Sequence, residues 1–186
     1  MHVKGRAIAL SGMITALAVV CIFLGSVLEF NTAFLLVLAA FLIGTVAALS
    51  GVPAALCSFA ATVILGCLLS PVKLYVLTFS LFVPYAVACE YTAKKKADKK
   101  SAALIKALVW WIWAVVCGFV FYLIAGAAGL TDLMPEIMKD AQTAVKLGIV
   151  ILALAVVWLI TDIAYYAYRK EINRRILNIF YKEERS

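Results

Sequence analysis

Two acidic residues, Glu90 and Asp162, stand inside otherwise apolar stretches of this 186-residue sequence. A carboxylate at membrane depth is costly to bury, so such residues commonly take part in proton relays or ion binding. Each acid also has a basic residue nearby: Lys94 follows Glu90 at the spacing of a helical ion pair, and Arg169 lies further along the chain from Asp162. We interpret both acids as paired structural charges, with proton transfer or acid chemistry as the alternative.

The residue sets that intramembrane catalysis needs are missing from the sequence. The single histidine is His2, and there is no His-Glu-x-x-His zinc motif. There is also no Gly-x-Ser-x-Gly nucleophile turn and no glycine-rich phosphate loop followed by lysine. The five cysteines lie in apolar stretches without a Cys-x-x-Cys pair, which indicates packing residues. We expect no enzyme activity, no metal and no cofactor, and an enzyme that uses Glu90 and Asp162 stays as an alternative.

Six apolar stretches, separated by short polar breaks, must position these residues. Hydrophobic residues make up 66% of the chain, well above the roughly 45–50% of soluble domains. A helix needs roughly 20 mostly apolar residues to cross a bilayer, and open sheet is excluded from lipid by its unpaired backbone groups. The sequence therefore predicts an all-α integral membrane protein, one domain with a bundle of six transmembrane helices. The predicted spans are 7–28, 33–49, 53–69, 72–91, 107–128 and 147–168.

Lysine and arginine residues gather in alternate breaks between these spans. Because short basic loops stay in the cytoplasm, we place both termini inside. This orientation puts 14 basic residues inside and leaves three outside, which are Lys73, Lys139 and Lys146. The formal net charge of +7 then reflects topology, so we expect contacts with anionic membrane lipid and no nucleic-acid partner.

Other segments are predicted to lie at the membrane boundary. Trp110, Trp111 and Trp113 fall near the inner end of the fifth span, where tryptophan commonly forms an interfacial belt. Residues 131–145 repeat apolar positions at helical spacing, which predicts an external amphipathic helix that lies on the outer leaflet or closes over a cavity. The first span is too long for the apolar core of a signal peptide, so we expect it to be retained.

Polar side chains converge at the predicted outer ends of the spans. Pro84 removes the hydrogen bond that would satisfy the carbonyl of Ser80, so the fourth span should kink there and present backbone polarity to a cavity. Lys73 would pair with the carboxylate or phosphate of a small amphipathic molecule. The alternative is that Lys73 and Glu29 only mark the membrane boundary. The predicted substrate-binding residues are Glu29, Asn31, Ser70, Lys73, Tyr75, Thr78, Tyr122 and Asp132.

Small residues line one face of the first span, at Ala9, Gly12 and Ala16. Helices in lipid associate closely through small side chains, so such a face can dock a helix of this chain or of a partner.

The chain resembles the substrate-binding component of energy-coupling factor transporters. The likeness rests on the six-helix layout at 20.2 kDa, the cytoplasmic ends, and the two runs 6–18 and 68–75. Members of that family capture vitamins or related micronutrients in an outward pocket. They dock through small residues of the first helix onto a transmembrane coupling subunit that carries two ATPase subunits.

The resemblance implies that Ala9, Gly12 and Ala16 form the docking face, although Gly12 stands where the family more usually has alanine. It also implies a multi-pass protein of a cell membrane, here a bacterial plasma membrane. A structural or regulatory membrane protein without a small-molecule ligand is the alternative, and its basic loop and tail would contact a cytosolic partner or anionic lipid. A transporter subunit should carry a stoichiometric small ligand, whereas a scaffold should not.

Overall fold

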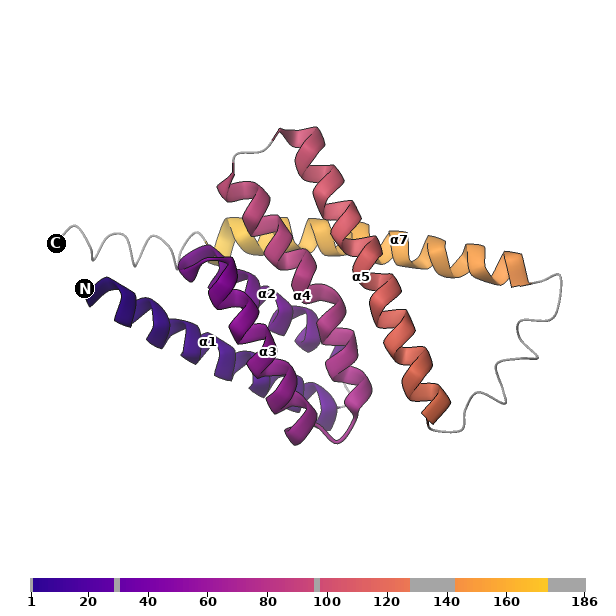
Figure 1. Ribbon diagram of the computed structural model, residues 1–186, viewed down its shortest axis with the longest axis horizontal. Helices are drawn as coiled ribbons and strands as arrows, with labels where there is room; N and C mark the ends of the chain where they lie inside the picture. Colours follow the sequence, from indigo (N-terminus) through magenta and orange to yellow (C-terminus); the bar gives the residue numbers. More distant parts are fainter. Residues whose placement is uncertain (1, 29–30, 96–97, 128–142, 174–186) are drawn as a thin grey trace. The chain divides into compact units, whose positions relative to one another are not determined.

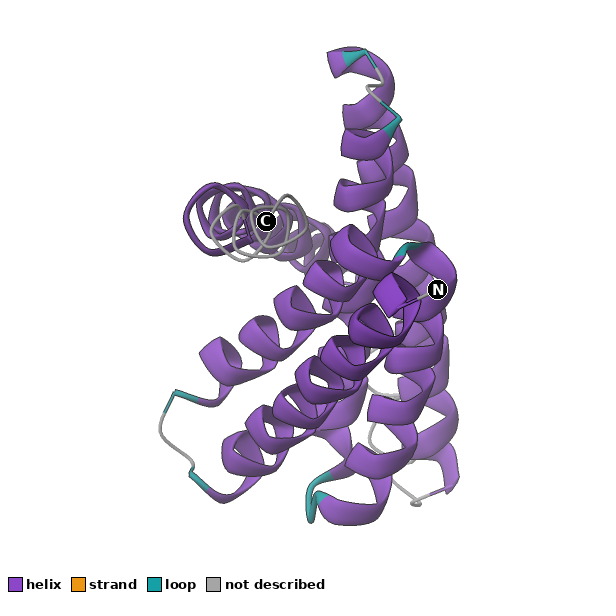
Figure 2. Ribbon diagram, turned by 90° about the vertical axis from the view of Figure 1, so that its left-hand side faces the viewer, coloured by secondary structure: helices purple, strands orange, loops and turns teal. Residues whose placement is uncertain are grey.

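The computed structural model describes residues 2–28, 31–95, 98–127 and 143–173, and every regular element among them is helical (Figures 1 and 2). Six helices are long and apolar enough to cross a membrane, and each predicted span overlaps one of them. The coarse prediction of an all-helical fold with six helices able to cross a membrane is therefore confirmed for the described residues. The helices are α1 (His2–Val27), α2 (Thr32–Ser50), α3 (Val52–Leu69), α4 (Lys73–Lys94), α5 (Lys99–Ala127) and α7 (Thr143–Tyr168), and a π-helical turn follows at Arg169–Asn173.

Several helices extend beyond their apolar spans into basic sequence. α1 begins at His2, α4 continues to Lys94, and α5 begins at Lys99, eight residues before the predicted span at 107–128. Lysine is a good helix former, so the backbone stays helical after the side chains become polar. Hydropathy therefore located the apolar part of each helix and underestimated its length.

Glycine and proline set the turns between the first four helices. Gly51 separates α2 from α3 with φ of 91°, a backbone conformation that favours glycine, and Pro53 lies in the first turn of α3. Pro71 follows the end of α3 and precedes α4. Asn31, just before α2, is left-handed with φ of 67°. These short turns reverse the chain at each step, so α1 to α4 alternate in direction (Figure 1).

The chain divides into two compact units, residues 1–114 and 115–186, with the boundary inside α5. In the first unit α2 packs against α1, α3 and α4, and α1 and α3 also contact α4. Its core is apolar and closely packed. Large side chains buried there include Ile22, Leu36, Ile43, Phe79 and Tyr85.

In the second unit, α7 ends in stacked tyrosines. The rings of Tyr165 and Tyr168 lie 6.1 Å apart at 29°, as expected for residues one turn apart on a helix. The hydroxyl of Thr161, one turn earlier, donates to the carbonyl of Val157 at 2.7 Å. A polar side chain on this helix thus finds its acceptor within the helix itself.

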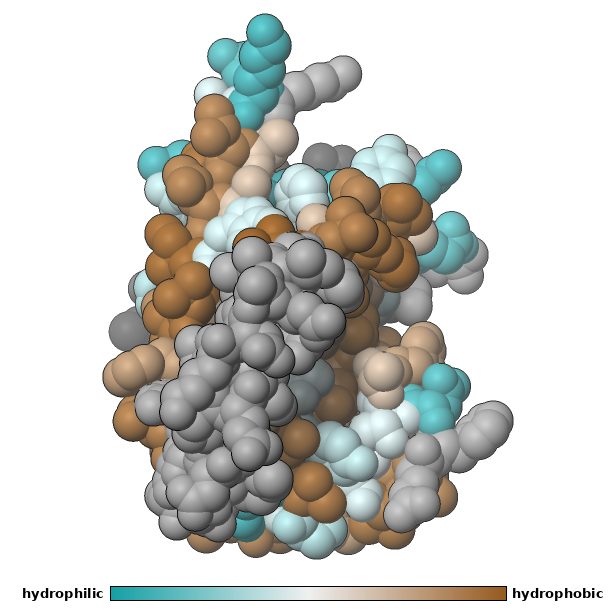
Figure 3. Space-filling view, turned by 90° about the vertical axis from the view of Figure 1, so that its right-hand side faces the viewer, coloured by the Kyte–Doolittle hydropathy of each residue, from teal (hydrophilic) through white to brown (hydrophobic). Residues whose placement is uncertain are grey.

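Large apolar side chains remain exposed along most of the helices. Met13, Leu68, Val115 and Ile163, from α1, α3, α5 and α7, are each more than 70% exposed. Much of the described surface on the face drawn in Figure 3 is hydrophobic. In water such surfaces would drive aggregation, whereas in a bilayer they are solvated by lipid. The exposed side chains thus agree with six membrane-crossing helices.

Gly66 is the point of closest approach between α3 and its neighbours. A Cβ atom placed there would lie 3.2 Å from Cγ2 of Val76 in α4 and 3.8 Å from Cγ2 of Ile22 in α1. By contrast, a Cβ atom at Gly118, also inside a helix, would meet nothing within 4 Å. Three helices therefore meet at Gly66 because it lacks a side chain.

We predict that Gly66→Leu destabilises the first unit by about 1–3 kcal/mol, since the added side chain must displace Val76 or Ile22. Thermal unfolding of the purified protein in detergent measures the effect. Gly118→Leu is the matched control and should leave the midpoint close to that of the unaltered chain. Equal midpoints for both variants would contradict the packing at Gly66.

Candidate functional site

The α3–α4 turn contains two of the predicted substrate-binding residues, Ser70 and Lys73. The ammonium of Lys73 donates to the carbonyl oxygens of Cys67 and Ser70, the latter at 3.2 Å. The hydroxyl of Ser70, a buried residue, donates to the carbonyl of Val72 at 3.1 Å. Because the last carbonyls of a helix lack intrahelical partners, Lys73 acts as a cap on the end of α3.

Tyr75 and Thr78 continue the same cluster into α4. Both side chains are half-buried, and the hydroxyl of Thr78 donates to the carbonyl of Leu74 at 3.0 Å. Asn31 lies exposed before α2 and makes no side-chain cap to that helix. The structure thus brings Ser70, Lys73, Tyr75 and Thr78 together on one turn and the helix that follows it.

Three other predicted substrate-binding residues lie beyond the described part of the first unit. Tyr122 belongs to α5 beyond the unit boundary. Glu29 and Asp132 lie outside the described residues, as does most of the predicted external segment 131–145, whose last three residues begin α7.

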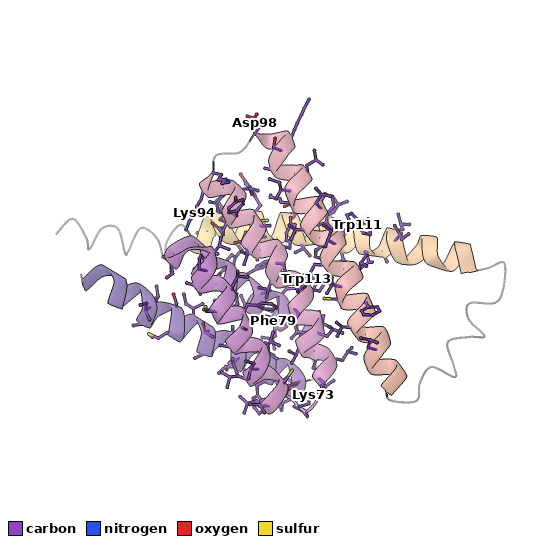
Figure 4. The ribbon with its side chains drawn as sticks, viewed as in Figure 1. Lys73, Phe79, Lys94, Asp98, Trp111 and Trp113 are labelled. Atoms are coloured by element: carbon purple, nitrogen blue, oxygen red, sulfur yellow. The ribbon has the colours of Figure 1, made fainter. Side chains whose placement is uncertain are left out.

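The carbonyl that Pro84 leaves without its helical donor has a partner on another helix. The indole Nε1 of Trp113, in α5, donates to the Ser80 oxygen at 2.8 Å. Figure 4 labels Trp113 where α4 and α5 lie next to each other. The prediction that this carbonyl would face a cavity is therefore wrong, because a tryptophan of the fifth helix satisfies it.

Trp110, one turn before Trp113, packs beside the same proline. Its ring lies 5.8 Å from that of Phe82 and 5.7 Å from that of Tyr85, edge to face in the second case. Trp110 is 0% exposed, so its prediction as an interfacial belt residue is wrong. Its indole N–H has no acceptor among the described residues. Packing between two helices therefore outweighs the preference of tryptophan for the membrane–water boundary at this position.

Lys94 and Glu90 lie at the end of α4 opposite Lys73 (Figure 4). The ammonium of Lys94 donates to the carbonyl of Ala47 at 2.8 Å, near the end of α2. Lys94 thus links α4 to α2 through a carbonyl that also accepts the backbone N–H of Gly51. Glu90 is only 2% exposed, which makes it the most deeply buried acid among the described residues with an assigned exposure. Asp162 is half-buried on α7.

The face of α1 predicted to dock a partner is exposed. Ala9, Gly12 and Ala16 all lie on the outside of the first unit, and a Cβ atom at Gly12 would meet nothing within 4 Å. The packed face of α1 carries Ser11 and Thr15 instead. The Ser11 hydroxyl lies 2.8 Å from the Ser50 hydroxyl of α2, and that of Thr15 donates to the Ser11 carbonyl. Small residues at these three positions are therefore not required by packing within the first unit.

Comparison of the chain with protein-family models, curated proteins and solved structures found no significant match. Among the described residues no group of three or more histidine, cysteine or acidic side chains could hold a metal ion. The arrangement offers two kinds of recognition. One is an exposed small-residue helix face, and the other is a lysine ammonium at a turn, held by carbonyl oxygens with which an anionic oxygen can compete.

Sequence reasoning missed the donor to the Ser80 carbonyl and the carbonyl acceptors of the two lysines. The sequence did hold a signal for the donor to Ser80, because the spacing of three residues places Trp110 and Trp113 on one face of their helix. The acceptors of Lys73 and Lys94 belong to neighbouring helices, so only the packed bundle reveals them.

Proposed function

We propose that this chain is the substrate-binding membrane subunit of an energy-coupling factor type importer. In this proposal it captures a vitamin or related small molecule on the outer side of a bacterial plasma membrane. It then docks on a separate transmembrane coupling subunit that carries two ATPase subunits. Both termini and the lysine-rich loop between α4 and α5 face the cytoplasm, as the distribution of lysine and arginine favours.

The observation that carries the proposal is the exposed small-residue face of α1. In lipid there is little hydrophobic force between helices, so close packing of small residues contributes much of the association energy. Ala9, Gly12 and Ala16 stay exposed after α1 has packed against its neighbours. The contrast with Gly66, which α1 and α4 approach closely, supports a role for Gly12 outside this bundle.

The proposal that the chain binds a small solute rests on the α3–α4 turn. Lys73 is exposed, and among the described residues its ammonium is held by neutral carbonyl oxygens. A carboxylate or phosphate forms stronger, charge-assisted hydrogen bonds, so it can replace those carbonyls as the partner of Lys73. Ser70, Tyr75 and Thr78 supply further hydrogen-bonding groups at the same turn, and the proposal extends to Asn31, Glu29, Tyr122 and Asp132 as further contacts.

A structural or regulatory membrane protein is the second candidate, and one observation favours it. The hydroxyls of Ser70 and Thr78 and the ammonium of Lys73 all donate to backbone carbonyls within the turn or its helices. Such contacts are sufficient to explain why these polar residues are present. Native mass spectrometry of the purified protein separates the candidates, because only the importer subunit retains a stoichiometric small molecule.

We predict that Gly12→Leu prevents association with the coupling subunit while the chain stays folded, since a leucine there blocks close helix approach. The chain is co-expressed with a coupling subunit and two ATPases from the same source, and the subunits that co-purify are quantified. Gly118→Leu, at a second exposed helical glycine, should co-purify normally. Retention of the whole complex by Gly12→Leu, with unchanged thermal unfolding, removes the docking assignment.

We predict that Lys73→Ala weakens binding of an anionic solute by about 2–5 kcal/mol, provided that the ion pair is buried in the complex. The fraction of protein that retains its small molecule, measured by native mass spectrometry, should fall accordingly. Lys95→Ala is the control, because the ammonium of Lys95 lies 4.8 Å from the Tyr91 ring at the other end of α4. Undiminished retention by Lys73→Ala excludes this lysine from the site.

A further inference from the structure

Burial changes along α4 just before Pro84, between Leu81 and Phe82. Phe82, Val83 and all residues of 85–90 are buried in the first unit. In residues 73–81 only Val76 and Phe79 are buried, and the others are half-buried or exposed. Residues 82–90 are therefore more deeply buried, apart from Pro84, than residues 73–81.

The first half of α4 has few partners. Val76 lies against Gly66 of α3, and the ring of Phe79 lies 6.1 Å from that of Phe59, also in α3. Lys73 holds the tip to the last carbonyls of α3. The Trp113–Ser80 hydrogen bond is the one interhelical hydrogen bond described for residues 74–83 in this structure.

Trp110 packs against α4 next to Pro84. This buried indole contacts Phe82 and Tyr85, which stand on either side of Pro84 in the sequence. Trp110 and Trp113 thus make different contacts one turn apart. Trp110 packs against the rings on either side of Pro84, and Trp113 donates a hydrogen bond to Ser80 in the first half of α4.

We propose that α4 is a hinged helix, in which residues 73–83 move as an arm about Pro84 and the Trp113–Ser80 hydrogen bond is the latch. Proline removes one backbone hydrogen bond and its ring crowds the preceding turn, so the bending stiffness of the helix is lowest at this position. Hinge motions of this kind commonly occur where a few residues absorb the change in backbone angles.

The arm carries Lys73, Tyr75 and Thr78, so the hinge deepens the proposed function and rests on it for its purpose. An anionic group that draws the Lys73 ammonium from the Cys67 and Ser70 carbonyls would release the tip of the arm from α3. The Trp113–Ser80 hydrogen bond would then be the remaining described hydrogen bond between the arm and another helix. Solute capture would in this way change the position of the arm, although the hinge itself can be tested without any solute.

Amide hydrogen exchange of the intact protein in detergent micelles, followed by mass spectrometry, tests the hinge. In the unaltered chain, amides of 77–83 should exchange at least about tenfold faster than those of 85–90, a factor that corresponds to about 1.4 kcal/mol. Equal protection in the two halves would overturn the hinge without any variant, and it would leave solute retention by the protein untouched.

Trp113→Phe keeps an aromatic ring but removes the latch donor. We expect about tenfold faster exchange in 77–83 and unchanged exchange in 85–90. The matched control is Trp111→Phe, because Trp111 is the half-buried neighbour in the same helix, and it should change neither segment. A uniform increase over both segments, or no increase in 77–83, would show that the bond is no latch.

Discussion

The arrangement of this protein depends on one constraint: a backbone carbonyl that water cannot reach must find a donor within the protein. The Ser80 carbonyl, which Pro84 leaves without its helical partner, shows how the chain meets it, because Trp113 donates to this oxygen. Lys73 donates at the end of α3, and Lys94 adds a second donor to the Ala47 carbonyl of α2, which also accepts the N–H of Gly51. Each donor comes from a different helix than its acceptor or from the turn that follows it. These bonds therefore also fix how neighbouring helices align.

Once the backbone carbonyls have hydrogen-bond donors, helices of the first unit can pack closely through small and polar side chains. Buried threonines such as Thr45 and Thr62 donate to the carbonyl one turn earlier in their own helix, so they add no unsatisfied donor to the core. Gly66 then allows α3 to lie directly against α4 and α1. The same principle explains why the exposed face around Gly12 is informative. Close approach is possible there, but no helix of the first unit makes use of it.

The sequence was a reliable guide to whatever depends on one helix at a time. The six apolar helices follow from the length of each hydrophobic run, and the orphan carbonyl at Ser80 follows from the position of Pro84. Contacts between helices were not predictable in this way. The donor to Ser80 lies 33 residues away, and the acceptor of Lys94 lies 47 residues away. Trp110 illustrates the same limit, because its preference for the boundary was overridden by packing against Phe82 and Tyr85.

A double-mutant cycle between Trp113 and Pro84 tests the central role of the cross-helix hydrogen bond most directly. The quantity is the free energy of unfolding in a mild detergent for the parent chain, Trp113→Phe, Pro84→Ala and the double variant. Alanine at position 84 returns a backbone N–H to the Ser80 carbonyl. Loss of the indole should therefore destabilise the parent by roughly 1–3 kcal/mol and the alanine background by much less. An equal loss in both backgrounds would contradict the account, because it would mean that Trp113 stabilises the unit through packing alone.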